Sequence, residues 1–200
     1  MKQTIVTLDL EGVLVPEIWI AVAEKTGIEG LKLTTRDIQD YDELMQGRLR
    51  ILEENSLGLS DIQAVIGTLS PLQGAKSFLD ELRSLTQVVI LSDTFVEFAK
   101  PLMQQLSWPT ILCHNLVIQE DRITDYKLRQ PNQKQEAVKA FKSLNYKVVA
   151  GGDSFNDTTM LGEADKGFLF HSPKNVQELF PQFQAVEEYD ELLDLIRSEL

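Results

Sequence analysis

Short apolar stretches recur along the chain, and each is followed by a turn and then by a helical pattern. Branched and aromatic side chains dominate these stretches, at residues 4–8, 88–91, 110–113, 147–150 and 167–170. Continuous apolar runs of this length are typical of strands that are buried on both faces of a parallel sheet. Helical periodicity follows them, at residues 73–85, 95–106, 134–144, 156–164 and 175–179, with a last amphipathic helix at 189–200. The alternation predicts right-handed βαβ crossovers and a doubly wound, mainly parallel α/β core.

Residues 15–71 break this alternation because they contain no strand-like run. The pattern favours three helices: 16–26 with Pro16 in its first turn, 37–54, and 60–68 with Ser60 as its cap. In the second helix one face is apolar, formed by Ile38, Tyr41, Leu44, Met45, Leu49 and Leu52. We therefore predict a small helical cap at 15–71.

The cap would be inserted after the first strand of a core that comprises residues 1–14 and 72–200. A second interruption, at residues 116–128, is typical of a β-hairpin that turns at 119–122. A chain of 200 residues with 43% apolar side chains is long enough for one such core with a small insertion.

Charge and cysteine content exclude several classes of protein. The chain has 19 Lys and Arg against 31 Asp and Glu, a net charge of −12, which argues against nucleic-acid and anionic membrane partners. Cys113 is the one cysteine, so neither a disulfide framework nor a cysteine zinc site is expected. Without a signal-peptide pattern or a membrane-spanning run, we expect a cytoplasmic protein. The sequence leaves the oligomeric state open, a homodimer included.

Polar residues that could carry chemistry follow three predicted strands. Asp9-Leu10-Glu11-Gly12 follows the first strand, Ser92-Asp93 the second, and Gly152-Asp153-Ser154-Phe155-Asn156-Asp157 the fourth, while Lys134 opens a helix. Each group alone has a simpler explanation: an acidic turn, a helix N-cap, a glycine turn, an exposed lysine. Together they predict one site, because open α/β sheets bind ligands beyond the carboxyl ends of their strands.

These residue types suit phosphoryl transfer. An ionised carboxylate such as that of Asp9 can attack phosphorus without a general base. Mg²⁺, held by Asp9 and Asp153, would offset the repulsion between carboxylate and phosphate. Ser92 and Lys134 would hold phosphate oxygens, and Glu11 could protonate the leaving alcohol and then deprotonate water.

The same residues resemble the haloacid dehalogenase superfamily of phosphohydrolases. That family has an aspartate nucleophile two residues before an acid/base, a Ser or Thr after the second core strand, a lysine, and a G-D-x-x-x-D motif. Within it the chain is similar to phosphoserine phosphatases, in particular to a subgroup linked with homoserine phosphotransfer. Two positions depart from the usual pattern: Glu11 stands where Asp is usual, and Ser92-Asp93-Thr94 where Ser-Gly-Gly is usual.

The resemblance implies a catalytic set. Asp9 would be phosphorylated, Glu11 would be the acid/base with its backbone carbonyl on Mg²⁺, and Asp153 and Asp157 would complete the metal site. The implied reaction is hydrolysis of O-phospho-L-serine to L-serine and phosphate.

The resemblance also implies which residues bind the substrate, a phosphorylated amino acid. Glu17 would bind the ammonium group and Arg48 the carboxylate, while Ser92, Asp93, Lys134 and Asn156 would hold the phosphate. If the substrate is a different one, Glu17 could simply interact with the positive N-terminal end of its helix, and Arg48 could lie on a solvated helix face.

Alternative functions remain at this point. Within the class, these are a phosphatase of another small phosphate ester and a phosphotransferase to homoserine. A receiver-type signalling domain also phosphorylates an aspartate, although it lacks the helical insert and carries its acceptor on the third strand. A binding protein with an inactive site is a further alternative. His114 and His171 are not spaced as metal ligands and receive no role.

Overall fold

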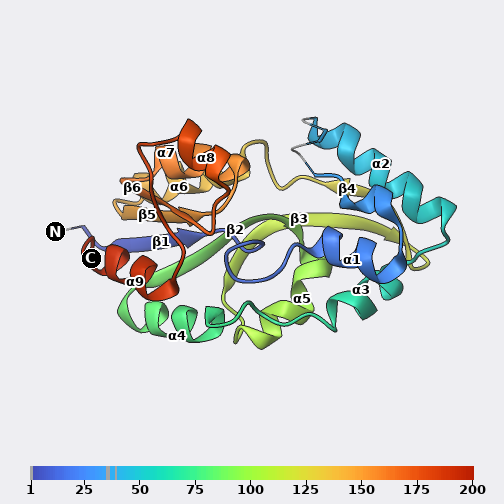
Figure 1. Ribbon diagram of the computed structural model, residues 1–200, viewed down its shortest axis with the longest axis horizontal. Helices are drawn as coiled ribbons and strands as arrows, with labels where there is room; N and C mark the ends of the chain where they lie inside the picture. Colours follow the sequence, from blue (N-terminus) through green and yellow to red (C-terminus); the bar gives the residue numbers. More distant parts are fainter. Residues whose placement is uncertain (1, 35–36, 39) are drawn as a thin grey trace.

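The structure is a computed structural model that describes residues 2–34, 37–38 and 40–200. Within these residues, a seven-stranded sheet has the order β4-β3-β2-β1-β5-β6-β7 (Figure 1). The strands are β1 (Thr4–Leu8), β2 (Gln87–Phe95), β3 (Thr110–Gln119), β4 (Arg122–Lys127), β5 (Lys147–Gly152), β6 (Lys166–Phe170) and β7 (Gln184–Val186). All neighbours pair in parallel except β3 and β4, which form the predicted hairpin. The doubly wound, mainly parallel core is confirmed.

Helices cover both faces of the sheet (Figure 1). One layer contains α4 (Ala75–Leu85), α5 (Val96–Gln105) and α9 (Tyr189–Arg197). The other contains α6 (Gln133–Ser143), the short 3₁₀ helix η2 (Phe155–Asp157), α7 (Thr158–Glu163) and α8 (Lys174–Leu179). The central strands β1, β2, β5 and β6 therefore lie between two helical layers, which explains their apolar runs.

Alternation along the strands divides the core into two apolar clusters. Val6 and Leu8 of β1 pack with the layer of α4, α5 and α9, whereas Ile5 packs with that of α6, α7 and α8. The same division separates Ile90 from Val89 in β2. Since successive side chains of a strand point to opposite faces of the sheet, a single strand register places alternate residues in the two clusters.

Among the described residues between β1 and α4, the named elements are all helices, joined by turns and loops. These are α1 (Ile18–Thr26), η1 (Glu29–Lys32), α2 (Tyr41–Glu54) and α3 (Leu59–Ile66). We call residues 15–71 the helical insert. Its buried side chains, such as Val22, Leu49 and Ile62, belong to the same cluster as the α4, α5 and α9 layer. The insert is thus packed onto the core and shares its apolar interior.

The three helix starts of the insert differ from those predicted. Helix α1 begins at Ile18 with Glu17 at its N-cap, so Pro16 precedes the helix and does not stand in its first turn. Helix α2 begins at Tyr41 rather than at residue 37, because the carboxylate of Asp40 caps it by accepting the Glu43 N–H at 2.9 Å. Residue 39 of the predicted helix lies outside the described residues, as do residues 35 and 36 of the predicted cap. Helix α3 has Gly58 at its N-cap, so the predicted cap at Ser60 is wrong: that hydroxyl donates to Asp121 of the hairpin turn.

Strands β2 and β3 extend furthest beyond their predicted ends, and one strand was missed. Strand β2 continues through Ser92 to Phe95, with an irregular register against β3 after Leu91. Strand β3 runs without a break into the hairpin. Strand β7 covers three residues of the sheet edge, and its run is too short for an alternating pattern to be visible.

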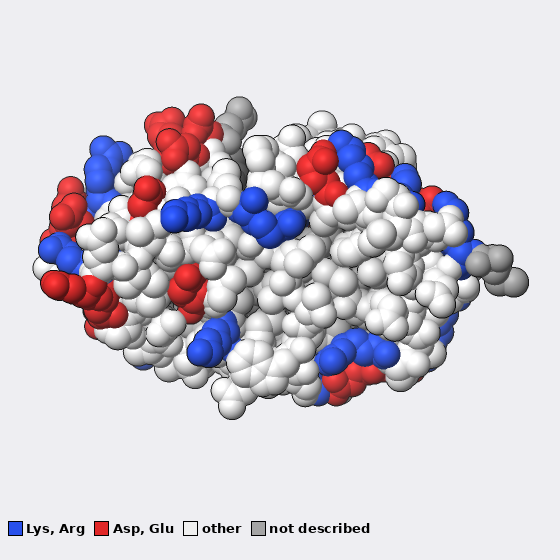
Figure 2. Space-filling view, turned by 180° about the vertical axis from the view of Figure 1, so that it is seen from behind, with Lys and Arg blue, Asp and Glu red and all other residues white. Residues whose placement is uncertain are grey.

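The surface carries both basic and acidic side chains. Figure 2 shows the face opposite to that of Figure 1, where basic side chains lie in separate groups, with acidic ones among them, around a broad uncharged area. None of the helices in the described part of the chain has both the length and the apolar character that a membrane span requires.

Candidate active site

The carboxyl ends of three neighbouring strands meet at one edge of the sheet. Strand β1 lies between β2 and β5 and pairs in parallel with both. The Asp9 N–H continues the ladder by donating to the Gly151 carbonyl at 3.0 Å. Asp9, Ser92 and Asp153 therefore come together although they are far apart in the sequence, as the strand-end pattern predicts.

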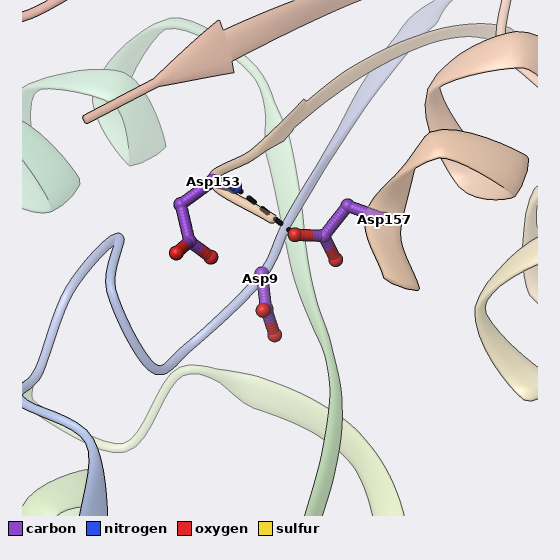
Figure 3. Close-up of side chains that lie close together, drawn as sticks. All are labelled: Asp9, Asp153 and Asp157. Atoms are coloured by element: carbon purple, nitrogen blue, oxygen red, sulfur yellow. Dashed lines mark hydrogen bonds between the residues drawn. The ribbon is translucent and has the colours of Figure 1, made fainter. Parts of the chain in front are cut away.

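Three buried carboxylates converge beyond β1 and β5 (Figure 3). Asp9, Asp153 and Asp157 each offer an oxygen within 4.8 Å of the others. Asp157, which is fully buried, accepts backbone N–H groups from Asp153 at 3.0 Å and Ser154 at 3.1 Å. These bonds fix the turn that presents Asp153.

Two glycines make room for this cluster. Gly12 has a φ of +78°, and a Cβ there would lie 2.5 Å from the Asp153 carboxyl carbon. A Cβ on Gly152 would lie 2.5 Å from atoms of the Asp157 side chain. Only glycine combines the backbone freedom with the close approach that the turn after β1 requires.

Lys134 joins the acidic groups. Its Nζ lies 2.7 Å from Asp157, 3.0 Å from Asp9 and 3.6 Å from Asp93, and the residue is only 3% exposed. Burial alone would lower the pKa of Lys134, but Asp157, Asp9 and Asp93 together raise it well above its usual range. Lys134 is therefore a buried, charged site residue, and the alternative of an exposed lysine is wrong.

Among the described residues, the carboxylates of the cluster outnumber the cations that contact them, and the pKa of Asp9 reflects this excess. Burial, followed by the charge of Asp157, raises the pKa of Asp9 well above its usual range, while Lys134 opposes the shift. A further cation in the cluster would restore an ionised Asp9. The donor set is composed entirely of oxygen atoms, which fits Mg²⁺.

Ser92 and Asp93 lie within the extended end of β2. The backbone N–H of Thr94 donates to the buried Ser92 hydroxyl at 3.3 Å. The N-cap residue of α5 is Phe95, so neither Ser92 nor Asp93 caps that helix. Burial would raise the pKa of Asp93, but Lys134, His114, Gln133 and Asn156 hold it well below its usual range. Asp93 is thus ionised and directed at donors around the site.

Glu11 reaches into the helical insert. Its Oε2 accepts the backbone N–H of Ile18, the first residue of α1, at 2.8 Å. Burial, with a contribution from Glu17, raises the pKa of Glu11 from 4.5 to about 7. Its carboxylate is outside the three-carboxylate cluster.

The two predicted substrate residues of the insert differ in burial. Arg48 of α2 lies over the Trp19 ring at 4.7 Å, donates to the Leu33 carbonyl at 2.7 Å, and has a buried Nε that no hydrogen-bond partner among the described residues reaches. Burial lowers its pKa to about 10. Glu17 is exposed at the N-cap of α1. The charges of Glu17 and Arg48 both influence the pKa of Glu11. Both residues therefore lie on the part of the insert that faces the carboxyl edge of the sheet.

Sequence patterns did not reveal four residues around Asp93. Tyr41 donates to its backbone carbonyl at 3.2 Å, Gln133 donates to its Oδ1 at 3.1 Å, and His114 Nε2 lies 3.6 Å from the same oxygen. Arg129 donates its backbone N–H to His114. Only Gln133 could have been suspected from the sequence, because it directly precedes Lys134. The contacts of the other three residues join segments that are distant in the sequence.

The chain matches a family model described as haloacid dehalogenase-like hydrolase over residues 4–165. It is 66% identical to a phosphoserine phosphatase of Pseudomonas syringae pv. tomato, over 94% of this chain and 80% of that protein. It is 64% identical to the phosphoserine phosphatase ThrH of Pseudomonas aeruginosa, over 94% of this chain and 92% of that protein.

A solved structure described as a phospho-aspartyl intermediate analogue of phosphoserine phosphatase has the same fold. Its TM-score is 0.80 at 19% identity, and the match covers 98% of this chain and 99% of the other. The family match favours a hydrolase over a receiver domain, and the strand order, the site and the relatives agree with it. The chain belongs to the haloacid dehalogenase-like hydrolase family.

Proposed function

We propose that this protein is a magnesium-dependent phosphatase that hydrolyses O-phospho-L-serine through a phosphorylated Asp9. The observation that carries the proposal is the placement of Asp9 next to Lys134, Asp153 and Asp157 at the carboxyl edge of the sheet. The two relatives at 64–66% identity, both named phosphoserine phosphatases, support the choice of substrate.

The residues of the cluster fit Mg²⁺. Asp9, Asp153 and Asp157 would hold the ion, with the backbone carbonyl of Glu11 as a further oxygen ligand. The ion would supply positive charge against the phosphate and the carboxylates. The raised pKa of Asp9 supports this assignment, because burial and the acidic neighbours together disfavour its charged form more than Lys134 offsets.

The residues of the chain divide the reaction between them. An oxygen of Asp9 forms the new bond to phosphorus as the bond from phosphorus to the serine oxygen breaks. Lys134, the Ser92 hydroxyl, the Asp93 N–H and the Asn156 amide would hold the phosphoryl oxygens. Glu11 gives its proton to the departing serine oxygen, and then takes a proton from the water that hydrolyses the aspartyl-phosphate.

Glu11 predicts a pH dependence. With a pKa of about 7, its carboxyl group is protonated below that pH and can act as an acid. We expect kcat/KM for phosphoserine to fall as the pH rises above about 7, and Glu11→Gln to give a low, flat profile. Glu24→Gln, at an exposed position of α1, is the control and should keep the wild-type profile. If Glu11→Gln kept the alkaline decline, another group would be responsible.

We propose that the insert acts as the cap that selects an amino-acid phosphate. The Arg48 guanidinium could pair with the substrate carboxylate in bidentate fashion, and its unpartnered Nε supports a role beyond packing. Glu17 would attract the ammonium group. The shared position of both residues near Glu11 supports a substrate that bridges insert and core.

A screen of phosphate release tests function and substrate together. With Mg²⁺, we expect phosphoserine to be preferred over phosphate esters that lack an amino-acid group. Arg48→Ala should remove most of that preference by raising KM for phosphoserine by about 10- to 100-fold, with a small effect on a simple aryl phosphate. Arg50→Ala, an exposed arginine of the same helix, should change neither. An unchanged preference in Arg48→Ala would contradict the cap assignment.

The same assay, repeated with homoserine, tests the alternative acceptor. Glu11 could activate an alcohol as it activates water, so phosphohomoserine would form at the expense of free phosphate. Chromatographic separation of the two products decides between hydrolysis and transfer. A cytoplasmic location stays a prediction, which cell fractionation would test.

A further inference from the structure

His114 is a buried residue of β3 to which the proposed reaction assigns no step. It is 3% exposed, and its Nδ1 accepts the backbone N–H of Arg129 at 3.1 Å. A neutral imidazole that accepts at Nδ1 carries its proton on Nε2. That Nε2–H faces Oδ1 of Asp93 at 3.6 Å, so the Arg129 bond sets the tautomer that can donate to the carboxylate.

The two carboxylate oxygens of Asp93 face different sets of groups. Oδ1 is directed at the scaffold: His114 Nε2, and the Gln133 amide at 3.1 Å. Oδ2 is directed at the phosphate site: the Asn156 amide at 3.0 Å and Lys134 Nζ at 3.6 Å. Asp93 therefore connects a scaffold of polar groups to two side chains that the reaction uses.

The scaffold around Oδ1 is closed by further bonds. Gln133 also donates to the Ser92 carbonyl at 2.7 Å, and its own side-chain oxygen accepts from the Arg129 guanidinium at 2.9 Å. Arg129 therefore holds both His114 and Gln133. The His114 ring lies against Phe95 and Tyr41, at centroid distances of 6.3 and 6.4 Å, which restrains its orientation.

We propose that His114 is a positioning residue for the phosphate site. It holds Oδ1 of Asp93 so that Oδ2 keeps the Asn156 amide and the Lys134 ammonium directed at the phosphoryl group. This inference rests on the proposed phosphoryl transfer at Asp9. Groups that orient the contacting side chains of a site affect its activity strongly without touching the substrate.

The test compares substitutions that remove or keep the donor. His114→Phe keeps an aromatic ring but cannot donate, and we expect kcat for phosphoserine to fall by about 10- to 100-fold, with a smaller change in KM. His114→Gln places an amide at a reach similar to Nε2 and should restore most of kcat, whereas the shorter His114→Asn should not. His171→Asn changes the other histidine, at an exposed position with a φ of +52° that asparagine tolerates, and should leave kcat unchanged.

A double-variant cycle tests whether His114 acts through Asp93. We expect Asp93→Asn with His114→Phe to be no slower than Asp93→Asn alone, because the same link is already broken. Losses that multiply would overturn the proposal. A lower melting temperature with unchanged kcat would overturn it as well, since His114 would then serve stability alone. If His114→Phe does not fold, equal kcat in the Gln and Asn variants is the contradicting result.

Calorimetric titration with inorganic phosphate and Mg²⁺ separates this inference from the proposed function. If the wild-type protein bound phosphate but failed to hydrolyse phosphoserine, the proposed function would fall. Weaker phosphate binding by His114→Phe than by His114→Gln would still support the positioning role. Equal phosphate affinity in both variants would contradict it.

Discussion

Asp9→Asn is expected to abolish turnover of phosphoserine and, at the same time, to stabilise the fold. An amide cannot attack phosphorus, so phosphate release should fall by roughly 10⁴-fold or more. The folded state carries Asp9 with a raised pKa, because burial and Asp157 disfavour its charge. Replacement by a neutral amide removes that cost, and the free energy of unfolding in the absence of Mg²⁺ should rise.

Two assays measure this prediction. Phosphate release reports turnover, and urea denaturation of the metal-free protein reports stability. Asp194→Asn, which changes an exposed aspartate of α9, should keep full turnover and nearly the wild-type stability. Appreciable hydrolysis by Asp9→Asn would contradict the role of Asp9 as nucleophile. A clear loss of stability would contradict the claim that the cluster carries excess negative charge.

Lys134→Met is expected to have the opposite effect on stability and a similar effect on turnover. The substitution leaves the carboxylates of Asp9, Asp93 and Asp157 without their shared cation. Removing one partner of a buried ion pair costs about 3–5 kcal/mol, so we expect a destabilisation of that size. Turnover should fall because the phosphoryl group also loses this charge.

Helix α6 supplies a matched control for Lys134. Lys139 lies on the same helix, is exposed and pairs with Glu136. Lys139→Met should leave the free energy of unfolding nearly unchanged, because an exposed ion pair contributes little to stability. Added Mg²⁺ should recover part of the stability lost in Lys134→Met, since both cations balance the same carboxylates. Equal unfolding free energies for Lys134→Met and Lys139→Met would contradict the account of the cluster.

The layered core could be predicted from local patterns, whereas the errors in this prediction arise where contacts between distant segments decide the structure. Parallel strands buried on both faces leave apolar runs, so the central strands were found near their true positions. Strand β2 was cut short because Ser92 and Asp93 are polar, although they continue the extended backbone toward β3. The start of α3 was misplaced because Ser60 is a common cap residue, while here it binds the distant Asp121.

Some features of the site could likewise be predicted from local patterns, whereas others depend on contacts between distant segments. Asp9, Ser92 and Asp153 could be placed together because each follows a strand, and parallel topology aligns strand ends. The bond from Glu11 to the first residue of α1 could not be predicted, since it depends on how the insert packs on the core. The same holds for the contacts of His114, which connect β3 with the loop before α6 and with the end of β2.

The most direct test of a phosphorylated Asp9 is a rapid quench in acid during turnover of radiolabelled phosphoserine with Mg²⁺. We predict label on the peptide that contains Asp9, with loss of the label when unlabelled phosphoserine is added before the quench. Asp9→Asn should give no label. Turnover at the wild-type rate without labelled protein, or stable label on another residue, would contradict the mechanism.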